Sequence, residues 1–174
     1  MDVISRAPEP SEWVLLSYHL PREPSAPRIA LWRRFKVLGV ARLQTNLVAL
    51  PAEVRTREQM DWLAEQVVQN GGEAGVWLAS AGAQRQEQDL IASITADRVE
   101  EYRQLAELIT AAQLLSGAAR NTAVKKLRRI WREISRRDYF PPPAKEETAQ
   151  LLDDMVQSLL DGSEVPAHST RMTS

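Results

Sequence analysis

Five basic residues recur at helical spacing between positions 121 and 137 of the chain. At 100° per residue their side chains fall within an arc of about 100° on one side of a helix, and apolar side chains gather on the other side. The basic residues are Lys125, Arg128, Arg129, Arg132 and Arg136. Guanidinium groups bind phosphate oxygens in bidentate fashion, and closely spaced cations gain from the release of DNA counterions. The pattern therefore favours a surface that binds a polyanion such as DNA.

A second basic group lies nearer the N-terminus, where Arg33, Arg34 and Arg42 are expected to support the first group. The net charge of the whole chain is only −1, so the signal lies in the placement of the charges. Both groups can instead be solvated outer faces, since acidic stretches at 87–107 and 145–154 could neutralise them. No helix-turn-helix, zinc-finger or RNA-recognition motif narrows the choice, and both interpretations stay open.

A catalytic site is harder to assemble from these residues. Ser17, Tyr18 and His19 come at the end of an apolar run, but a nucleophile and its base need a third, orienting partner that the sequence does not supply. His19 is therefore interpreted as a histidine at the end of a strand. The chain has no cysteine and two histidines, so we expect no catalytic residue, no metal site and no bound cofactor.

The elements that must position these residues begin with the apolar run Trp13–Leu20, which is typical of a central strand covered on both faces. Two short strands joined at Thr45–Asn46 predict a hairpin, and Gly71–Gly72 ends a helix that starts near Thr56. The resulting order over 12–82 is strand, helix, strand, strand, helix, strand. This order predicts a ferredoxin-like βαββαβ module, with the first and third strands in the middle and both helices on one face.

After residue 83 the strand signals stop, and apolar residues follow helical spacing. We expect three helices, at about 88–116, 121–137 and 145–160, so that 83–162 forms a helical extension and the chain is α+β. Residues 1–11 and 163–174 are expected to be flexible tails. The five tryptophans are interpreted as anchors of the core. No apolar run reaches transmembrane length and the N-terminus is unlike a signal peptide, which indicates a soluble, cytoplasmic protein that does not contact a membrane.

Several segments, in order, resemble the N-terminal domain of ChrB-type chromate-resistance regulators. They are WVLLSYHLP and PSAPRIALWRRFKVLG within 13–39, NGGEA at 70–74, DRVEEYRQL at 97–105 and RRDYF at 136–140. The resemblance spans about residues 12 to 140. It implies a ferredoxin-like module followed by helices, in proteins that repress a chromate-efflux operon and release it when chromate is present. The C-terminal domain of ChrB proteins is not found in this chain, so the protein is expected either to bind DNA without responding to chromate or to need a partner that responds.

Two functional hypotheses follow from the residues and the resemblance together. The first is a chromate-resistance regulatory protein without enzymatic activity, a homodimeric repressor that contacts DNA through the basic helix. The second is an oxyanion-binding or protein-interaction module that never touches DNA, in which two or three arginines hold chromate or sulfate as an effector.

Overall fold

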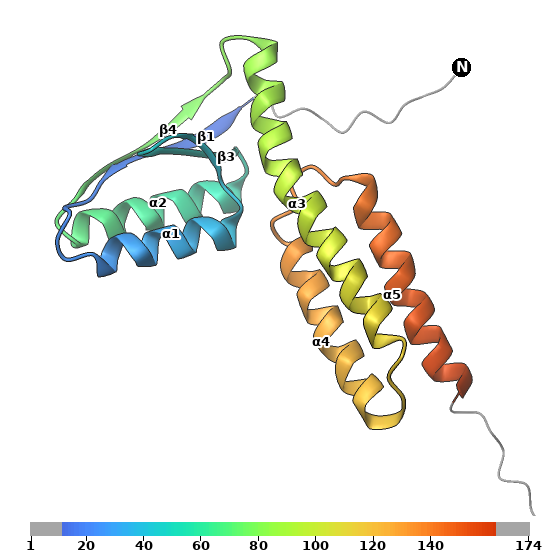
Figure 1. Ribbon diagram of the computed structural model, residues 1–174. Coiled ribbons are helices and arrows are strands. Elements are labelled where there is room, and N and C mark those ends of the chain that lie inside the picture. Colours follow the sequence, from blue (N-terminus) through green and yellow to red (C-terminus); the bar gives the residue numbers. More distant parts are fainter. Residues whose placement is uncertain (1–11, 163–174) are drawn as a thin grey trace, which may run out of the picture. The chain divides into compact units, whose positions relative to one another are not determined.

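The computed structural model describes residues 12–162, and this part of the chain forms a four-stranded antiparallel sheet and five helices (Figure 1). The elements are β1 (Trp13–His19), α1 (Ala26–Leu38), β2 (Ala41–Gln44), β3 (Leu47–Pro51), α2 (Val54–Gln69), β4 (Glu73–Ala79), α3 (Gln84–Ala112), α4 (Gly117–Ser135) and α5 (Pro143–Gly162). The predicted α+β class is confirmed. The predicted flexible tails at 1–11 and 163–174 lie outside the described residues.

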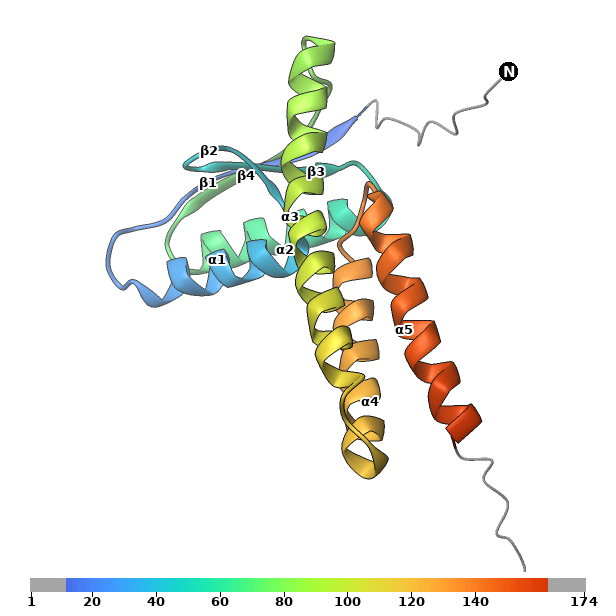
Figure 2. The same cartoon turned by 45° about the vertical axis from the view of Figure 1, so that its right-hand side comes forward.

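The strands of the sheet follow the order β2-β3-β1-β4, so the first and third strands lie in the middle, as predicted. Leu16 at the centre of β1 pairs with Val48 on one side and with Val76 on the other. Helices α1 and α2 lie side by side on one face of the sheet (Figures 1 and 2). The core between these layers consists of Val14, Leu16, Leu20, Leu31, Phe35, Val48, Leu50, Met60, Leu63 and Val67.

The opposite face of the sheet is covered over part of its area. Trp13, Ala41 and Ala49 are buried there against Ile94 of α3, and the ring of Phe140 lies 6.2 Å from the ring of Trp13. Toward the other end of β1 the same face opens, since Ser17 is half-buried and His19 is exposed. The prediction that both faces of β1 are covered is therefore right for the first half of the strand.

The chain divides into two compact units, and the division falls within α3 rather than before it. The first unit contains the sheet, α1, α2, the chain up to Arg98 and the short segment Arg136–Pro141. The second contains Val99–Ser135 and the described residues from Pro142 onward, and its core is wholly helical. That core consists of Tyr102, Leu105, Ile109, Ala112, Val124, Leu127, Ile134, Leu152 and Met155. Along residues 12–162, no helix is both long and apolar enough to cross a membrane.

The tryptophans do not all anchor the core, and that prediction is wrong for most of them. Trp13 is only 1% exposed, but Trp32, Trp62 and Trp77 are 47%, 45% and 60% exposed. Trp131 is half-buried. Helical spacing places Trp32 next to the buried residues of α1, but it does not show where the buried face of the helix ends. A large apolar side chain at the edge of that face fits the helical period as well as a buried one does. The exposed rings are instead paired with cations or with polar groups, as described below.

Helix α2 begins two residues before the predicted start, with Glu53 as its N-cap. Thr56, near which the helix was predicted to start, is its third residue, and its hydroxyl accepts a hydrogen bond from the Glu53 amide at 2.9 Å. The same hydroxyl donates to the carbonyl oxygen of Pro51, and Thr56 is fully buried. One side chain thus ties the end of β3 to the start of α2.

Replacing Thr56 by valine is expected to lower the free energy of unfolding by about 2 kcal/mol. Valine keeps the shape of the side chain but removes the hydroxyl, so that the Glu53 amide and the Pro51 carbonyl keep only their 3.0 Å hydrogen bond to each other. Urea denaturation followed by circular dichroism measures the change. Thr56→Ser, which keeps the hydroxyl, is the matched control and should retain most of the stability; equal losses in the two variants would contradict the assigned role.

Candidate functional site

Helix α4 carries the basic face that the sequence predicts. Its apolar side is buried in the helical core through Val124, Leu127 and Ile134. Because these positions face inward, the cations between them are directed to solvent. The exposed basic residues on this face are Lys125, Arg128, Arg129 and Arg132. Charge and apolar surface are therefore segregated on α4.

Part of this face forms the wall of a groove between α4 and α5. The groove has a volume of about 560 Å³, and α5 contributes one carboxylate, that of Asp153. Helix α4 contributes Lys125, Arg128, Trp131 and Arg132, and α5 contributes Ala149, Leu152 and Asp153. Three cations and the half-buried indole of Trp131 thus line one concave surface. Such a surface can hold phosphate oxygens by charge-assisted hydrogen bonds and an apolar group against the ring.

Neutralisation by neighbouring carboxylates affects one cation of this face. Arg129 Nε lies 3.6 Å from a carboxylate oxygen of Glu133, and both side chains are exposed, so the pair is weak. Arg132 Nε donates to the backbone carbonyl of Arg128 at 3.3 Å, which leaves its charge uncompensated. Within residues 12–162, neither Lys125, Arg128 nor Arg132 forms an ion pair. The positive charges of these three residues of α4 are thus open to a ligand.

The acidic residues of α3, which could have neutralised α4, are partly engaged on their own helix. Arg103 forms ion pairs with Glu100, at 2.7 Å, and with Glu107. Hydrogen bonds from the Arg103 guanidinium hold the pKa of the Glu100 carboxyl at about 2, so this group stays charged down to strongly acidic pH. Two of the acidic side chains of the stretch 87–107 thus have a local partner.

Arg136 does not belong to the basic face, and its predicted place on the helix is wrong. Helix α4 ends at Ser135, and the backbone carbonyl of Arg136 accepts a hydrogen bond from Arg55 at 3.0 Å. Just beyond, the hydroxyl of Tyr139 donates to the Leu38 carbonyl at 3.1 Å, and burial raises the pKa of Tyr139. Packing of this segment in the first unit accompanies the end of the helix at Ser135, two residues before the predicted end at 137.

The second basic group lies in the first unit, with Arg33 and Arg34 on α1 and Arg42 on β2. All three are exposed. The guanidinium carbon of Arg34 lies 5.2 Å from the centre of the Trp62 ring, a cation–π distance. Lys36 lies 4.0 Å from the Trp32 ring in the same way. The predicted site residues therefore divide between the units: Lys125, Arg128 and Arg132 share one groove, and Arg33, Arg34 and Arg42 do not belong to it.

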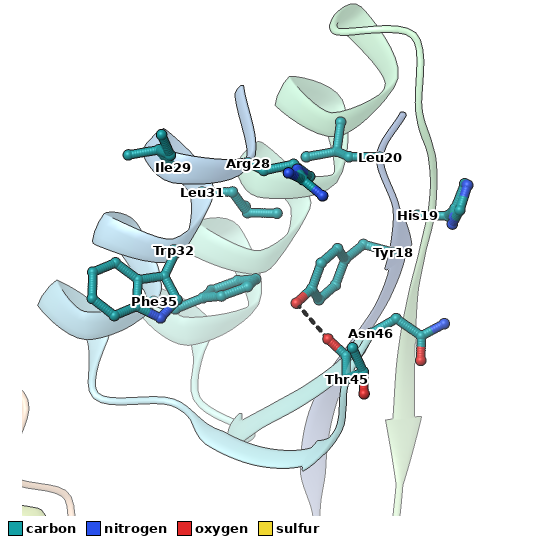
Figure 3. A pocket seen from close by; sticks show the side chains of 10 residues that line it. All are labelled: Tyr18, His19, Leu20, Arg28, Ile29, Leu31, Trp32, Phe35, Thr45 and Asn46. Atoms are coloured by element: carbon teal, nitrogen blue, oxygen red, sulfur yellow. Dashed lines mark hydrogen bonds between the residues drawn. The ribbon is translucent and has the colours of Figure 1, made fainter. Parts of the chain in front are cut away.

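An aromatic pocket that the sequence did not indicate lies between α1, the end of β1 and the β2–β3 turn (Figure 3). Its volume is about 400 Å³, and the ring centres of Tyr18 and Phe35 lie 5.2 Å apart with the ring planes tilted by 56°. The Tyr18 hydroxyl donates to the Thr45 carbonyl at 2.9 Å. Burial raises the pKa of Tyr18, and the charge of Arg42 acts in the opposite direction. Trp32 is the signal that could have revealed this pocket, because the residues beside it in the sequence are too polar for a position in the core.

The Ser17 hydroxyl, which was considered for catalysis, forms hydrogen bonds to residues of the neighbouring strand β4. Ser17 Oγ donates to the Gly75 carbonyl at 3.3 Å and accepts a hydrogen bond from Trp77 Nε1 at 3.0 Å. In the described part of the chain, no group of three or more histidine, aspartate and glutamate side chains is arranged to hold a metal ion. Fold and surface together define a small α+β protein with a segregated basic helix.

The comparison with known families agrees with that description. Residues 28–113 match the family model described as protein ChrB, N-terminal, and the chain thus carries the N-terminal domain of the ChrB family. The match starts in α1 and ends just after α3. It makes the chain a regulatory protein related to chromate resistance. No curated protein and no solved structure matches the chain.

Proposed function

We propose that this protein is a homodimeric repressor that binds the DNA of a chromate-efflux operon through the basic face of α4, and that it is not an enzyme. The observation that carries the proposal is the exposed, unpaired state of Lys125, Arg128 and Arg132 on one side of the helix. The ferredoxin-like βαββαβ module is, in this proposal, the scaffold that the family shares.

The chemistry of the α4 face suits a phosphate backbone better than a neutral partner. Arginine binds a phosphate in bidentate fashion, and each phosphate that is neutralised releases condensed counterions from the duplex. Val124 and Leu127 are locked in the core, so the helix cannot turn its cations inward. Phosphate contacts set position and affinity rather than sequence preference, which base contacts must supply.

The alternative is an oxyanion-binding module that takes chromate or sulfate as its ligand and does not bind DNA. The concave shape of the α4–α5 groove, with three cations on one wall, favours it. The carboxylate of Asp153 in the same groove opposes it, because a second negative charge repels a dianion at close range.

Binding of the full chain to a duplex from upstream of its own gene, measured between about 50 and 200 mM salt, tests the proposal. We expect log K to fall with log salt with a slope of about −2.7 to −3.6 for each chain of the dimer, which corresponds to three or four phosphate contacts per chain. Calorimetry with sodium chromate and sodium sulfate tests the alternative. Chromate binding without any DNA affinity at low salt would replace the proposed function with the alternative, and a salt-independent affinity for DNA would contradict the assigned surface.

A further inference from the structure

Strand β4 forms an edge of the sheet and pairs with β1 along one side only. Seven consecutive residues, Glu73–Ala79, pair with β1 in one uninterrupted register. Among residues 12–162, no other backbone segment pairs with the outward side of β4. A regular edge of this kind presents a row of amide and carbonyl groups to which another strand can bind.

The two edges of the sheet differ in how they are protected. Strand β2, at the other edge, has four residues, carries Arg42 and shifts its register between Arg42 and Gln44. Short length, a charge and an irregularity are the usual means of blocking strand addition. Strand β4 lacks this protection: it has seven residues in one regular register, its sequence EAGVWLA contains no proline, lysine or arginine, and its one charge is at its first residue.

Two large apolar side chains of β4 are exposed beside this open edge. Trp77 is 60% exposed and Leu78 is 44% exposed, and they lie on opposite faces of the strand. The hydrogen bond from Trp77 Nε1 to Ser17 holds the indole along the sheet, across Gly75. A Cβ at Gly75 would lie 2.9 Å from that nitrogen, so glycine is what allows the ring to lie there. The edge therefore presents apolar surface on both faces, and on one of them the indole of Trp77 is held in place.

We propose that β4 pairs antiparallel with β4 of a second copy of the chain, so that two sheets join into one across a two-fold axis. This inference specifies the interface of the homodimer in the proposed function and rests on that function for its oligomeric state alone. With the axis at Val76, Gly75 lies opposite the partner's Trp77, and Ala74 lies opposite the partner's Leu78. Each large residue then faces a small one, a pattern that makes the strand complementary to itself.

Charge also favours a second copy in this register. The Glu73 carboxylates of the two chains lie at opposite ends of the paired strands, about 20 Å apart, which exceeds the screening length in physiological salt. Opposite each Glu73 lies an uncharged alanine, Ala79 of the partner subunit. No like charges therefore oppose the association of the two strands.

The first test is the oligomeric state of the full chain without DNA, measured by sedimentation equilibrium. Replacing Trp77 and Leu78 together by lysine is expected to raise the dissociation constant of the dimer by about 100-fold or more, since it removes apolar contacts and places like charges at the edge. Both side chains are exposed, so the fold should be retained. The matched control is Gln44→Lys with Thr45→Lys, which adds the same charge at the β2 edge and should leave the dimer intact.

The second test uses the absence of cysteine from the chain. A Val76→Cys variant should form a disulfide-linked dimer under mild oxidation, because residues that face each other across an antiparallel pair have Cα atoms 4.5–5.5 Å apart, within the range of a disulfide. Gln44→Cys, at the other edge, should not. A monomeric wild type, or a dimer that survives the double lysine variant, overturns the inference. Neither test contains DNA, so a failure of DNA binding by itself would not contradict the proposed interface.

Discussion

A triple variant in which Arg128, Arg129 and Arg132 are alanine should bind DNA on the order of 100-fold more weakly than the wild type at about 0.1 M salt. The salt slope should fall by about 2.7 for each chain of the dimer, or 0.9 for each lost phosphate contact. The fold should be unaffected, because these side chains are exposed and alanine is the best helix former. Fluorescence anisotropy of a labelled duplex over a salt series gives both quantities.

The control for this variant must change the net charge by the same amount elsewhere. Arg22, Arg57 and Arg85 are exposed, lie outside α4 and provide such a control when all three are replaced by alanine. If the surface is specific, the control retains the wild-type slope within about one unit. Equal losses of affinity in the two triple variants would mean that DNA binding depends on net charge alone, and the assignment of the α4 face as the DNA-binding surface would be wrong.

Gly72→Ala should strongly destabilise the first unit, with a loss of about 3 kcal/mol in the free energy of unfolding. A Cβ at this position would lie 2.3 Å from the carbonyl oxygen of His19 and 2.8 Å from a methyl group of Val67. The oxygen belongs to the backbone at the end of β1, so a side-chain rotation cannot relieve the overlap. Urea denaturation followed by circular dichroism measures the change.

The neighbouring Gly71 provides the control, because it differs from Gly72 both in its backbone conformation and in the free space around it. Gly71 has a positive φ of 77°, but a Cβ there would meet nothing within 4 Å. Gly71→Ala should therefore cost only the backbone strain of about 1–2 kcal/mol. If Gly71→Ala proved to be the more damaging of the two, the close approach between β1 and the end of α2 would be incorrect.

Much of the first unit could be predicted from the sequence because its elements are short and clearly punctuated. The pair Gly71–Gly72 marks the end of α2, and the apolar run from Trp13 marks the central strand. The basic face of α4 was predictable as well, since helical spacing assigns each residue to a side whatever the helix packs against.

What the sequence did not reveal depends on contacts between residues far apart in the chain. The end of α4 before Arg136 follows from the packing of Tyr139 against Leu38, about a hundred positions away. The exposure of Trp62 follows from the cation–π contact with Arg34, a residue of another helix. Periodicity is a property of one segment, and it carries no information about such partners.

The path of the chain through the two units has a consequence for how the protein is synthesised and cut into fragments. Trp13, near the start, has its ring against Phe140, which leaves the ribosome only after α3 and α4. The layer over that face of the sheet is consequently completed late in translation. A fragment limited to the family-matched segment 28–113 would lack both β1 and Phe140, and with them the central strand and its aromatic cover.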